Sequence, residues 1–291
     1  MTRKPPSRVM AIHDLSGVGK CSLTVALPIL SAMGAEVAAM PTAILSTHTG
    51  NILGYTYRDL TDDMLPMARH WRSLGLRFDA LYSGWLGSSK QNGIVAGIFD
   101  DFSAKGTLRL VDPVMGDHGR LYSTYTPDRV RGMALLCAKA DVITPNLTEA
   151  CFLLGEEYRP GAMSLEGARA LCGRLTGLGA SNVVVTGIST GPDTIGAAAL
   201  EAGTGAFSLH EMPKVPGAWH GTGDIFSSVL LGGLLHGCPL CEAAGLAVDF
   251  TRGCIARTYA TGTDPRLGVD FERGLPGLVE ALHKGGSLDG R

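Results

Sequence analysis

The chain has 291 residues, 45% of them hydrophobic and 18% charged, with a formal net charge of −2. This balance is typical of a soluble protein with a substantial core, and the lack of a basic excess argues against nucleic-acid binding. Two prolines, a glycine and a glutamate interrupt the longest apolar region, residues 25–45. We therefore expect no membrane span and a cytoplasmic location.

Short apolar runs alternate with longer amphipathic stretches along most of the chain. This alternation is typical of βαβ units and predicts an α/β fold, with a mostly parallel sheet covered by helices on both faces. Two runs beside the glycine-rich turn 203–205 instead predict an antiparallel hairpin at one sheet edge. In chain order, the expected elements are strand 9–13, helix 22–33, strand 36–40, helix 62–74, strand 80–83, helix 90–104, strand 108–112, helix 127–138, strand 142–144, helices 146–154 and 164–178, strands 183–186, 196–202 and 207–212, and helices 223–236, 240–258 and 271–284.

No linker-like segment divides the chain. We therefore expect one domain over residues 1–291, with residues 1–7 and 285–291 as flexible tails. The seven cysteines are odd in number and scattered along the chain, which argues against a disulfide framework.

The segment HDLSGVGKCS, residues 13–22, stands between an apolar run and a helical pattern, as a phosphate-binding loop does. The signature of that loop is G-x-x-x-x-G-K-[ST]. Here Asp14 replaces the first glycine, and Cys21 replaces the hydroxyl that would bind Mg²⁺. A carboxylate would also repel a phosphate. We interpret the segment as a strand–turn–helix loop that binds something other than a triphosphate.

In open α/β sheets, ligands bind beyond the carboxyl ends of the strands. The segments at these places in the chain are polar and rich in glycine, which is typical of an enzyme that acts on a small molecule. They are residues 14–19, 46–50 (STHTG), 83–88 (SGWLGS), 112–117 (DPVMGD), 144–150 (TPNLTEA), 186–187 and 221–224 (GTGD).

The GTGD segment is the most informative, because Gly221 and Gly223 permit a tight turn directly before a helix. Free backbone N–H groups and the helix dipole make such a helix start an anion site. Asp224 in the first turn can face the same pocket as a general base, as phosphoryl transfer to an alcohol requires. The alternative is an aspartate that only caps the helix.

Two further segments offer oxygen ligands for Mg²⁺ and its waters. Asp112 follows a strand and Asp117 follows a glycine turn, while Asn146 and Glu149 lie three residues apart on one side of a helix start. The same spacing fits a capping box with Asn146 as the N-cap. The two interpretations do not exclude each other.

The segments DPVMGD, TPNLTEA and GTGD have the order and spacing of the ribokinase-like superfamily. In detail the chain resembles the pyridoxal (vitamin B6) kinases from residue 9 to about residue 257, and STHTG and SGWLGS resemble segments that line their vitamin pocket. The resemblance implies a three-layer ribokinase-like sandwich and an ATP-dependent kinase. Its substrate would be the 5′-hydroxymethyl group of pyridoxal, pyridoxamine or pyridoxine. It also implies a homodimer. Together with the net charge and the interrupted apolar region, it leads us to expect small molecules as the other partners, not nucleic acid or membrane.

The resemblance further implies roles for the matching residues. On the substrate side, His48 and Thr49 would bind or flank the pyridine, and Trp85 would pack on the ring or close the pocket. A structural hydrogen bond at His48 and core packing at Trp85 are the alternatives. Asp224 would be the general base, and Gly221, Thr222 and Gly223 the anion hole. The residues implied for ATP, Mg²⁺ and a monovalent cation such as K⁺ are Asp112, Asp117, Tyr122, Thr144, Asn146, Glu149 and Thr186, with Asp112 and Glu149 as the metal ligands.

The chain departs from the pyridoxal kinase pattern at His13 and Asp14, where those enzymes commonly have Gln-Ser and the serine touches the pyridine nitrogen. A carboxylate here can accept from a protonated ring nitrogen or pair with an ammonium group. We therefore expect Asp14 to favour pyridoxamine, whose aminomethyl group is cationic.

The nearest alternative is a hydroxymethylpyrimidine kinase of thiamine synthesis, because the SGGAG loop of those enzymes resembles residues 16–19 here. They often carry Cys at the position of Asp224, however, and STHTG fits the B6 enzymes better. Sugar and nucleoside kinases usually carry an early lid of extra strands, for which the first expected strand leaves little room. A silent vitamer-binding protein is the non-enzyme alternative; it would lack Asp224 or the metal-binding acids, and all of these are present.

Overall fold

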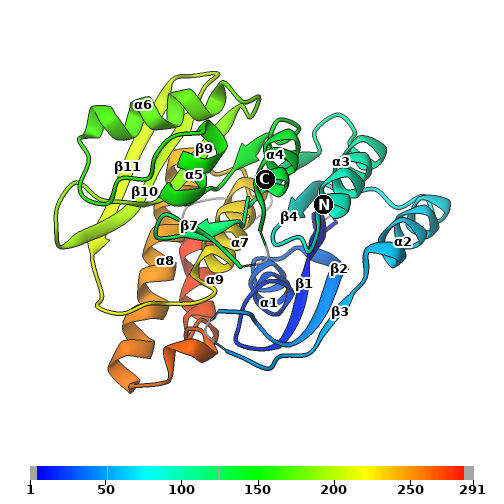
Figure 1. Ribbon diagram of the computed structural model, residues 1–291, viewed down its shortest axis with the longest axis horizontal. Coiled ribbons are helices and arrows are strands. Elements are labelled where there is room, and N and C mark those ends of the chain that lie inside the picture. Colours follow the sequence, from blue (N-terminus) through cyan, green and yellow to red (C-terminus); the bar gives the residue numbers. More distant parts are fainter. Residues whose placement is uncertain (1–4, 51, 124, 285–291) are drawn as a thin grey trace.

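A nine-stranded sheet runs through the centre of the molecule, in the order β11-β10-β9-β8-β5-β4-β1-β2-β3 (Figure 1). The computed structural model describes residues 5–50, 52–123 and 125–284. The strands from β2 to β9 in this order are parallel, whereas β3, β10 and β11 pair antiparallel with their neighbours. The strands of this sheet are β1 Arg8–Val18, β2 Glu36–Thr47, β3 Tyr57–Asp59, β4 Ala80–Ser83, β5 Leu108–Val111, β8 Val142–Ile143, β9 Asn182–Ile188, β10 Thr194–Glu201 and β11 Ala206–Pro213.

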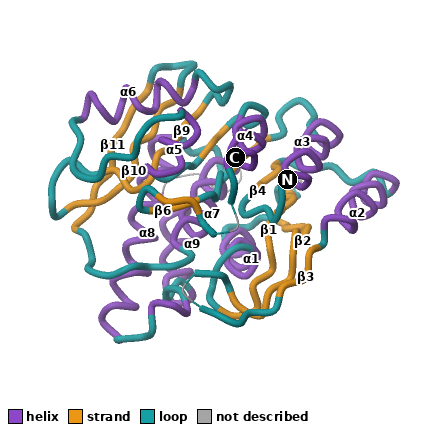
Figure 2. The backbone as a smooth tube through the Cα atoms, viewed as in Figure 1, coloured by secondary structure: helices purple, strands orange, loops and turns teal. Residues whose placement is uncertain are grey.

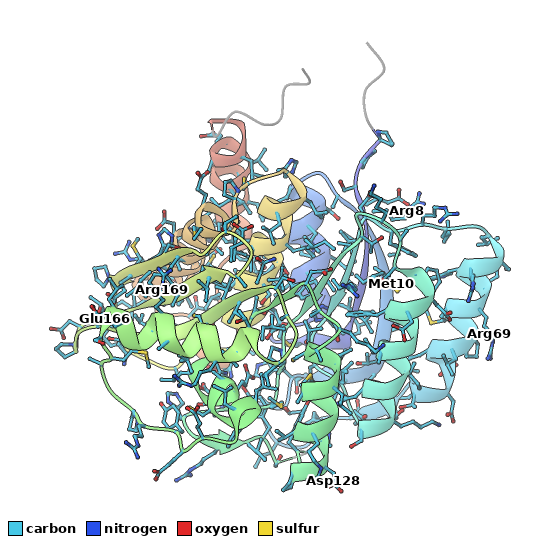
Figure 3. The ribbon with its side chains drawn as sticks, turned by 90° about the horizontal axis from the view of Figure 1, so that it is seen from above. Arg8, Met10, Arg69, Asp128, Glu166 and Arg169 are labelled. Atoms are coloured by element: carbon cyan, nitrogen blue, oxygen red, sulfur yellow. The ribbon has the colours of Figure 1, made fainter. Side chains whose placement is uncertain are left out.

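Helices cover both faces of the sheet and give the three layers that the alternating pattern predicts (Figure 2). Seen from above, the two helical layers lie on opposite sides of the strands (Figure 3). One layer consists of α2 Thr61–Ser73, α3 Ser89–Phe102, α4 Pro127–Cys137, α5 Leu147–Leu154 and α6 Leu165–Thr176. The other consists of α1 Leu23–Ala32, α7 Thr222–Leu235, α8 Leu240–Thr261 and α9 Leu275–Lys284. Among the described residues, no helix is long and apolar enough to cross a bilayer.

The central strands are apolar without alternation because both of their faces are buried. In β1, Met10 and Ile12 pack under α2 to α5, whereas Val9 packs against the layer of α1, α7 and α8. Residues that face either layer must then be apolar, which explains the continuous runs in the sequence. The predicted edge hairpin is confirmed as β10 and β11, which pair from Thr194–Pro213 to Glu201–Ala206.

The first two strands are longer than the sequence predicts. β1 continues through the glycine segment to Val18, and β2 continues to Thr47, with paired residues up to Val18–Thr47. Their register shifts between His13 and Leu15, where β2 has one residue more than β1, so Asp14 lies opposite a bulge of β2. The expected loop over residues 14–19 is therefore wrong for most of its length, because a neighbouring strand supplies backbone partners there.

Three short strands and the start of the last helix also differ from the expectation. The pattern did not predict β3 or the two-residue strands β6 (Gly116–Asp117) and β7 (Arg120–Leu121), which are too short to show a period. The last helix begins at Leu275 instead of residue 271, after the 3₁₀ turn Glu272–Gly274. Residues 1–4 and 285–291 of the expected tails lie outside the described part of the chain.

Candidate active site

The start of α7 is a tight backbone turn at the carboxyl edge of the sheet. Its N-cap, Gly221, has φ 76°, in the left-handed region, and a Cβ on it would lie 2.1 Å from the carbonyl oxygen of Lys20. Only glycine fits both constraints. No side chain caps this helix end, so its first N–H groups are free to bind an anion.

Asp224 lies in the first turn of α7 with 13% of its side chain exposed. Burial raises the pKa of this carboxyl to about 7, with a hydrogen bond from the backbone of Ser22 opposing the shift and the charge of Asp14 adding to it. A carboxylate that titrates near neutral pH is well matched to general-base catalysis. Asp224 does not cap α7 with its side chain, so the alternative left open by the sequence does not hold in this structure.

Hydroxyl groups connect Asp112 to α7 and to Thr144, the residue directly after β8. The Ser227 hydroxyl donates to Asp112 Oδ2 at 3.1 Å and lies 2.9 Å from Thr144 Oγ1. The pKa of Asp112 is raised by burial and by the charges of Glu149 and Asp224. Sequence reasoning missed Ser227, although its place three residues after Asp224 puts both on one helix face.

Hydrogen bonds connect the start of α5 to the segment that follows β5. Asn146 and Glu149 form a complete capping box, with the Asn146 side chain accepting from the Glu149 N–H and the reverse. Glu149 Oε1 also accepts from the Met115 N–H at 2.9 Å, and Asn146 Nδ2 donates to the Gly116 carbonyl at 2.9 Å. The capping box that the sequence offered as one interpretation is thus present, and burial raises the pKa of Glu149 to about 8.

The remaining nucleotide-side candidates surround this junction. Thr186 forms an isolated bridge with Asn146. Tyr122 is 41% exposed, and the pKa of its hydroxyl is raised by burial and by four carboxylates, those of Glu149, Asp117, Asp112 and Asp224. Asp117 lies on β6 with an exposed side chain. The structure therefore brings the nucleotide-side candidates of the sequence to one place, beside the start of α7.

The turn between β1 and α1, residues 19–22, holds an unusual backbone. Lys20 and Ser22 have positive φ angles of 47° and 53°, rare for residues with a side chain. The carboxylate of Asp14 connects this turn to β1, because it accepts hydrogen bonds from the hydroxyls of Ser22 in the turn at 2.5 Å and Ser16 in β1 at 2.7 Å. Lys20 forms an ion pair with Glu272 at 2.9 Å, so it is engaged with the C-terminal segment. Both observations agree with the conclusion that this is not a phosphate-binding loop.

On the substrate side, His48 is buried and both of its ring nitrogens have protein partners. Nδ1 accepts from the Gly50 N–H at 3.0 Å, so the proton lies on Nε2, which donates to the Arg266 carbonyl at 2.6 Å. Its ring also lies 5.0 Å from that of His220, the residue before the anion hole. Sequence reasoning missed His220, whose signal was its place directly before GTGD. The structural hydrogen bond that was the alternative for His48 is present.

The other two substrate-side candidates, Thr49 and Trp85, are more exposed to solvent than His48. Thr49 is exposed. Trp85 is half-buried against the core of α2 to α5, with its ring 6.5 Å from that of Tyr57 in an edge-on arrangement. In the described part of the chain, no hydrogen bond or ring contact links either residue to α7, so a contact of either with substrate stays a prediction.

Comparison with known proteins agrees with this geometry. A model of the phosphomethylpyrimidine kinase family matches residues 29–267. The chain belongs to the phosphomethylpyrimidine kinase family.

Two solved structures are similar over nearly the whole chain. A putative phosphomethylpyrimidine kinase from Bacteroides thetaiotaomicron, in a crystal form with pyridoxal, is 38% identical with a TM-score of 0.90, over 94% of this chain and 96% of that chain. Pyridoxal kinase from Lactobacillus plantarum is 34% identical with a TM-score of 0.86, over 96% of this chain and 99% of that chain.

A curated relative supports the same assignment. The pyridoxine/pyridoxal/pyridoxamine kinase of Bordetella bronchiseptica is 30% identical over 274 residues, which are 88% of this chain and 91% of that protein. Membership of the phosphomethylpyrimidine kinase family confirms the expected ribokinase-like fold and the expected class of enzyme, an ATP-dependent phosphotransferase.

Proposed function

We propose that this member of the phosphomethylpyrimidine kinase family transfers the γ-phosphoryl group of ATP to the 5′-hydroxymethyl group of a B6 vitamer. The observation that carries the proposal is the place of Asp224, a partly exposed carboxylate in the first turn of a helix whose N-terminus has no side-chain cap. The relatives, which include a pyridoxal kinase and a pyridoxine/pyridoxal/pyridoxamine kinase, support the vitamer as acceptor.

In the proposed mechanism, Asp224 accepts the proton of the vitamer hydroxyl as its oxygen attacks the γ-phosphorus. The backbone N–H groups of Gly221, Thr222 and Gly223 hold the charge that develops on the transferred group. Because these groups are fixed by the turn before attack begins, they need little reorganisation. The other product is ADP, and the proton leaves Asp224 when the product departs.

Mg²⁺ fits the donor set that this site offers. The carboxylates of Glu149 and the partly exposed Asp224 act electrostatically on the buried carboxylate of Asp112, and a cation between these groups and ATP would offset their repulsion. In the described residues, no group of three or more His, Cys, Asp or Glu could hold a metal by itself. Kinase Mg²⁺ is instead typically bound by one or two carboxylates together with phosphates, for which we propose Asp112 and Glu149. When bound, the metal shields the phosphate charge.

The other nucleotide-side roles are proposed on the same basis. Asp117, Tyr122, Thr144, Asn146 and Thr186 surround Asp112 and Glu149, and we assign them to ATP and to a monovalent cation such as K⁺. His48 is assigned a role in shaping the vitamer pocket, since its two nitrogens are already engaged.

A hydroxymethylpyrimidine is the second candidate acceptor, favoured by the family model and by the similarity to the putative phosphomethylpyrimidine kinase from Bacteroides thetaiotaomicron. An ADP-release assay with pyridoxal, pyridoxamine, pyridoxine and hydroxymethylpyrimidine, each with ATP and Mg²⁺, separates the candidates. We expect the highest kcat/KM with a vitamer. A higher value with the pyrimidine would reverse the assignment, and tight vitamer binding without ADP release would indicate the silent binding protein.

We also propose a cytoplasmic homodimer, formed through the sheet edge near β2 and β3. Val18, Ile44 and Leu53 are apolar and 51%, 44% and 94% exposed there, which is costly for a surface in water. Light scattering after size-exclusion chromatography tests this. Leu53→Asp should give a monomer, whereas Leu135→Asp, at a 72% exposed leucine of α4, should leave the dimer intact. A wild-type protein that is monomeric would contradict the proposal.

A further inference from the structure

His13 is a completely buried histidine directly behind the proposed base. Its side chain has no exposed surface, and its Nδ1 lies 3.9 Å from Asp224 Oδ1. Asp224 itself remains 13% exposed. The carboxylate therefore stands between the imidazole and the approach to the site.

The surroundings of His13 are shaped to hold the ring in this place. Its ring packs edge-to-face on Tyr82, with centroids 4.2 Å apart and an interplanar angle of 79°. On the other side lies Gly84, where a Cβ would come within 2.1 Å of Nδ1. Any larger residue at 84 would displace the ring, so the absence of a side chain there serves His13.

Neither ring nitrogen of His13 has a hydrogen-bond partner among the described residues. A buried polar group without a partner costs about 1–3 kcal/mol, and such groups are rare enough to need an explanation. A leucine or phenylalanine would fill this space equally well and would bury no unpaired polar atom. Asp224 Oδ1, 3.9 Å away, could pair with Nδ1, and a side-chain movement of about 1 Å would close the gap to hydrogen-bond distance.

The charge state of His13 determines which way such a bond runs. Burial lowers the pKa of the imidazole to about 3, so the ring is neutral at physiological pH and has one N–H and one bare nitrogen. With the proton on Nδ1, the ring donates to an ionised carboxylate and cannot take its proton. Catalytic hydrogen bonds are often long before substrate binds and shorten in the complex.

We propose that His13 is a positioning residue that donates from Nδ1 to Asp224 Oδ1 and so turns Oδ2 toward the vitamer hydroxyl. The hydroxyl proton goes to Oδ2, and His13 keeps its own proton throughout. The arrangement follows the general logic of a base oriented by a third group. This inference rests on the proposed function, because it assigns Asp224 as the base.

Two variants of similar size test the donor. His13→Asn keeps an N–H close to the position of Nδ1, whereas His13→Leu fills the space without one. We expect His13→Leu to lower kcat at least about tenfold with the KM for ATP within about twofold, and His13→Asn to stay within about threefold of wild type. His210→Leu makes the same change at a histidine of β11 whose ring contacts the Cys241 carbonyl instead of Asp224, so it is the control and should leave kcat unchanged.

Each outcome decides whether His13 orients Asp224 or only fills space. Full kcat in His13→Leu, or equal losses in both variants together with equal falls in melting temperature, would mean that His13 only fills space. If His13→Leu does not fold, ¹⁵N NMR of the wild-type imidazole still tests the proposal: we expect the proton on Nδ1, and a proton on Nε2 overturns it. If wild type phosphorylates neither vitamer nor pyrimidine, the proposed function fails instead, which the kinetic baseline shows separately.

Discussion

At the scale of single residues, Asp224 combines partial exposure with a pKa raised to about 7 by burial. A base must be accessible to its substrate yet poorly solvated if it is to take a proton near neutral pH, and these demands conflict with stability. The turn over residues 19–22 and the start of α7 enclose the carboxylate on either side. Burial therefore both suits the Asp224 carboxylate to take a proton and lowers the stability of the folded protein.

Asp224→Asn should lower kcat by at least about 100-fold, the usual scale for losing a general base. The amide keeps the size of the side chain, so calorimetric binding of ATP should stay within about threefold of wild type. Steady-state kinetics with pyridoxal provide the measurement. Unchanged turnover would remove Asp224 from the mechanism.

The same variant should reveal the cost of burying the carboxylate. The folded pKa, about 7, lies above the ordinary value of 3.8, so Asp224 contributes stability at low pH that is lost as the pH rises from about 4 to 7. The amide that replaces the carboxyl group in the variant does not ionise. The melting temperature of the variant minus that of wild type should therefore increase over this pH range and then level off. A constant difference would contradict a raised pKa.

Asp14 is the residue expected to decide between vitamers. Asp14→Asn should lower the ratio of kcat/KM for pyridoxamine over that for pyridoxal, because it removes the charge that attracts the aminomethyl group. Ser16→Ala is the matched control, since it removes one hydrogen bond to Asp14 but keeps the carboxylate. If the ratio is the same in Asp14→Asn and wild type, the carboxylate serves only to fasten the turn.

At the scale of elements, α5 and the β6–β7 hairpin form one unit at the nucleotide side. Besides the capping box, the Thr148 hydroxyl accepts from the Gly119 N–H at 2.9 Å. The hairpin has only two residues in each strand, too few to be stable alone. The start of α5 therefore supplies the order that the hairpin lacks.

Thr148→Val should raise the KM for ATP several-fold with little change in kcat, because it leaves the Gly119 N–H without its partner and loosens the hairpin. The loss of stability should be about 1–2 kcal/mol. Thr176→Val removes a comparable hydroxyl contact at the exposed end of α6 and serves as the control. Equal KM values in the two variants would show that the hairpin does not contribute to ATP binding.

At the scale of the whole molecule, one sheet lies between two helical layers, and β1 contributes side chains to the core on both sides. If either helical layer separated from the sheet, the apolar side chains of the strands would be exposed to water. The sequence predicts a single domain, and the physical expectation that follows is cooperative unfolding.

The tryptophans allow this to be tested. Trp71 and Trp85 pack against one core, whereas Trp219 packs against the other. Urea unfolding followed by fluorescence of wild type and of Trp219→Phe should give the same midpoint as circular dichroism. Separate midpoints for the two layers would contradict the single domain.

The sequence by itself determined the order of the helices, the parallel sheet, the edge hairpin and the segments that form the site. These depend on local signals: the period of apolar residues, glycines at a helix start, and the spacing of Asn146 and Glu149 in a capping box. Only the tertiary structure decided that β1 runs on to Val18, that Ser227 joins Asp112 to α7, and that both nitrogens of His48 are engaged. It also placed His13 behind Asp224, which is more than 200 residues away in the chain. Such contacts depend on partners distant in sequence, whose distances no local pattern records.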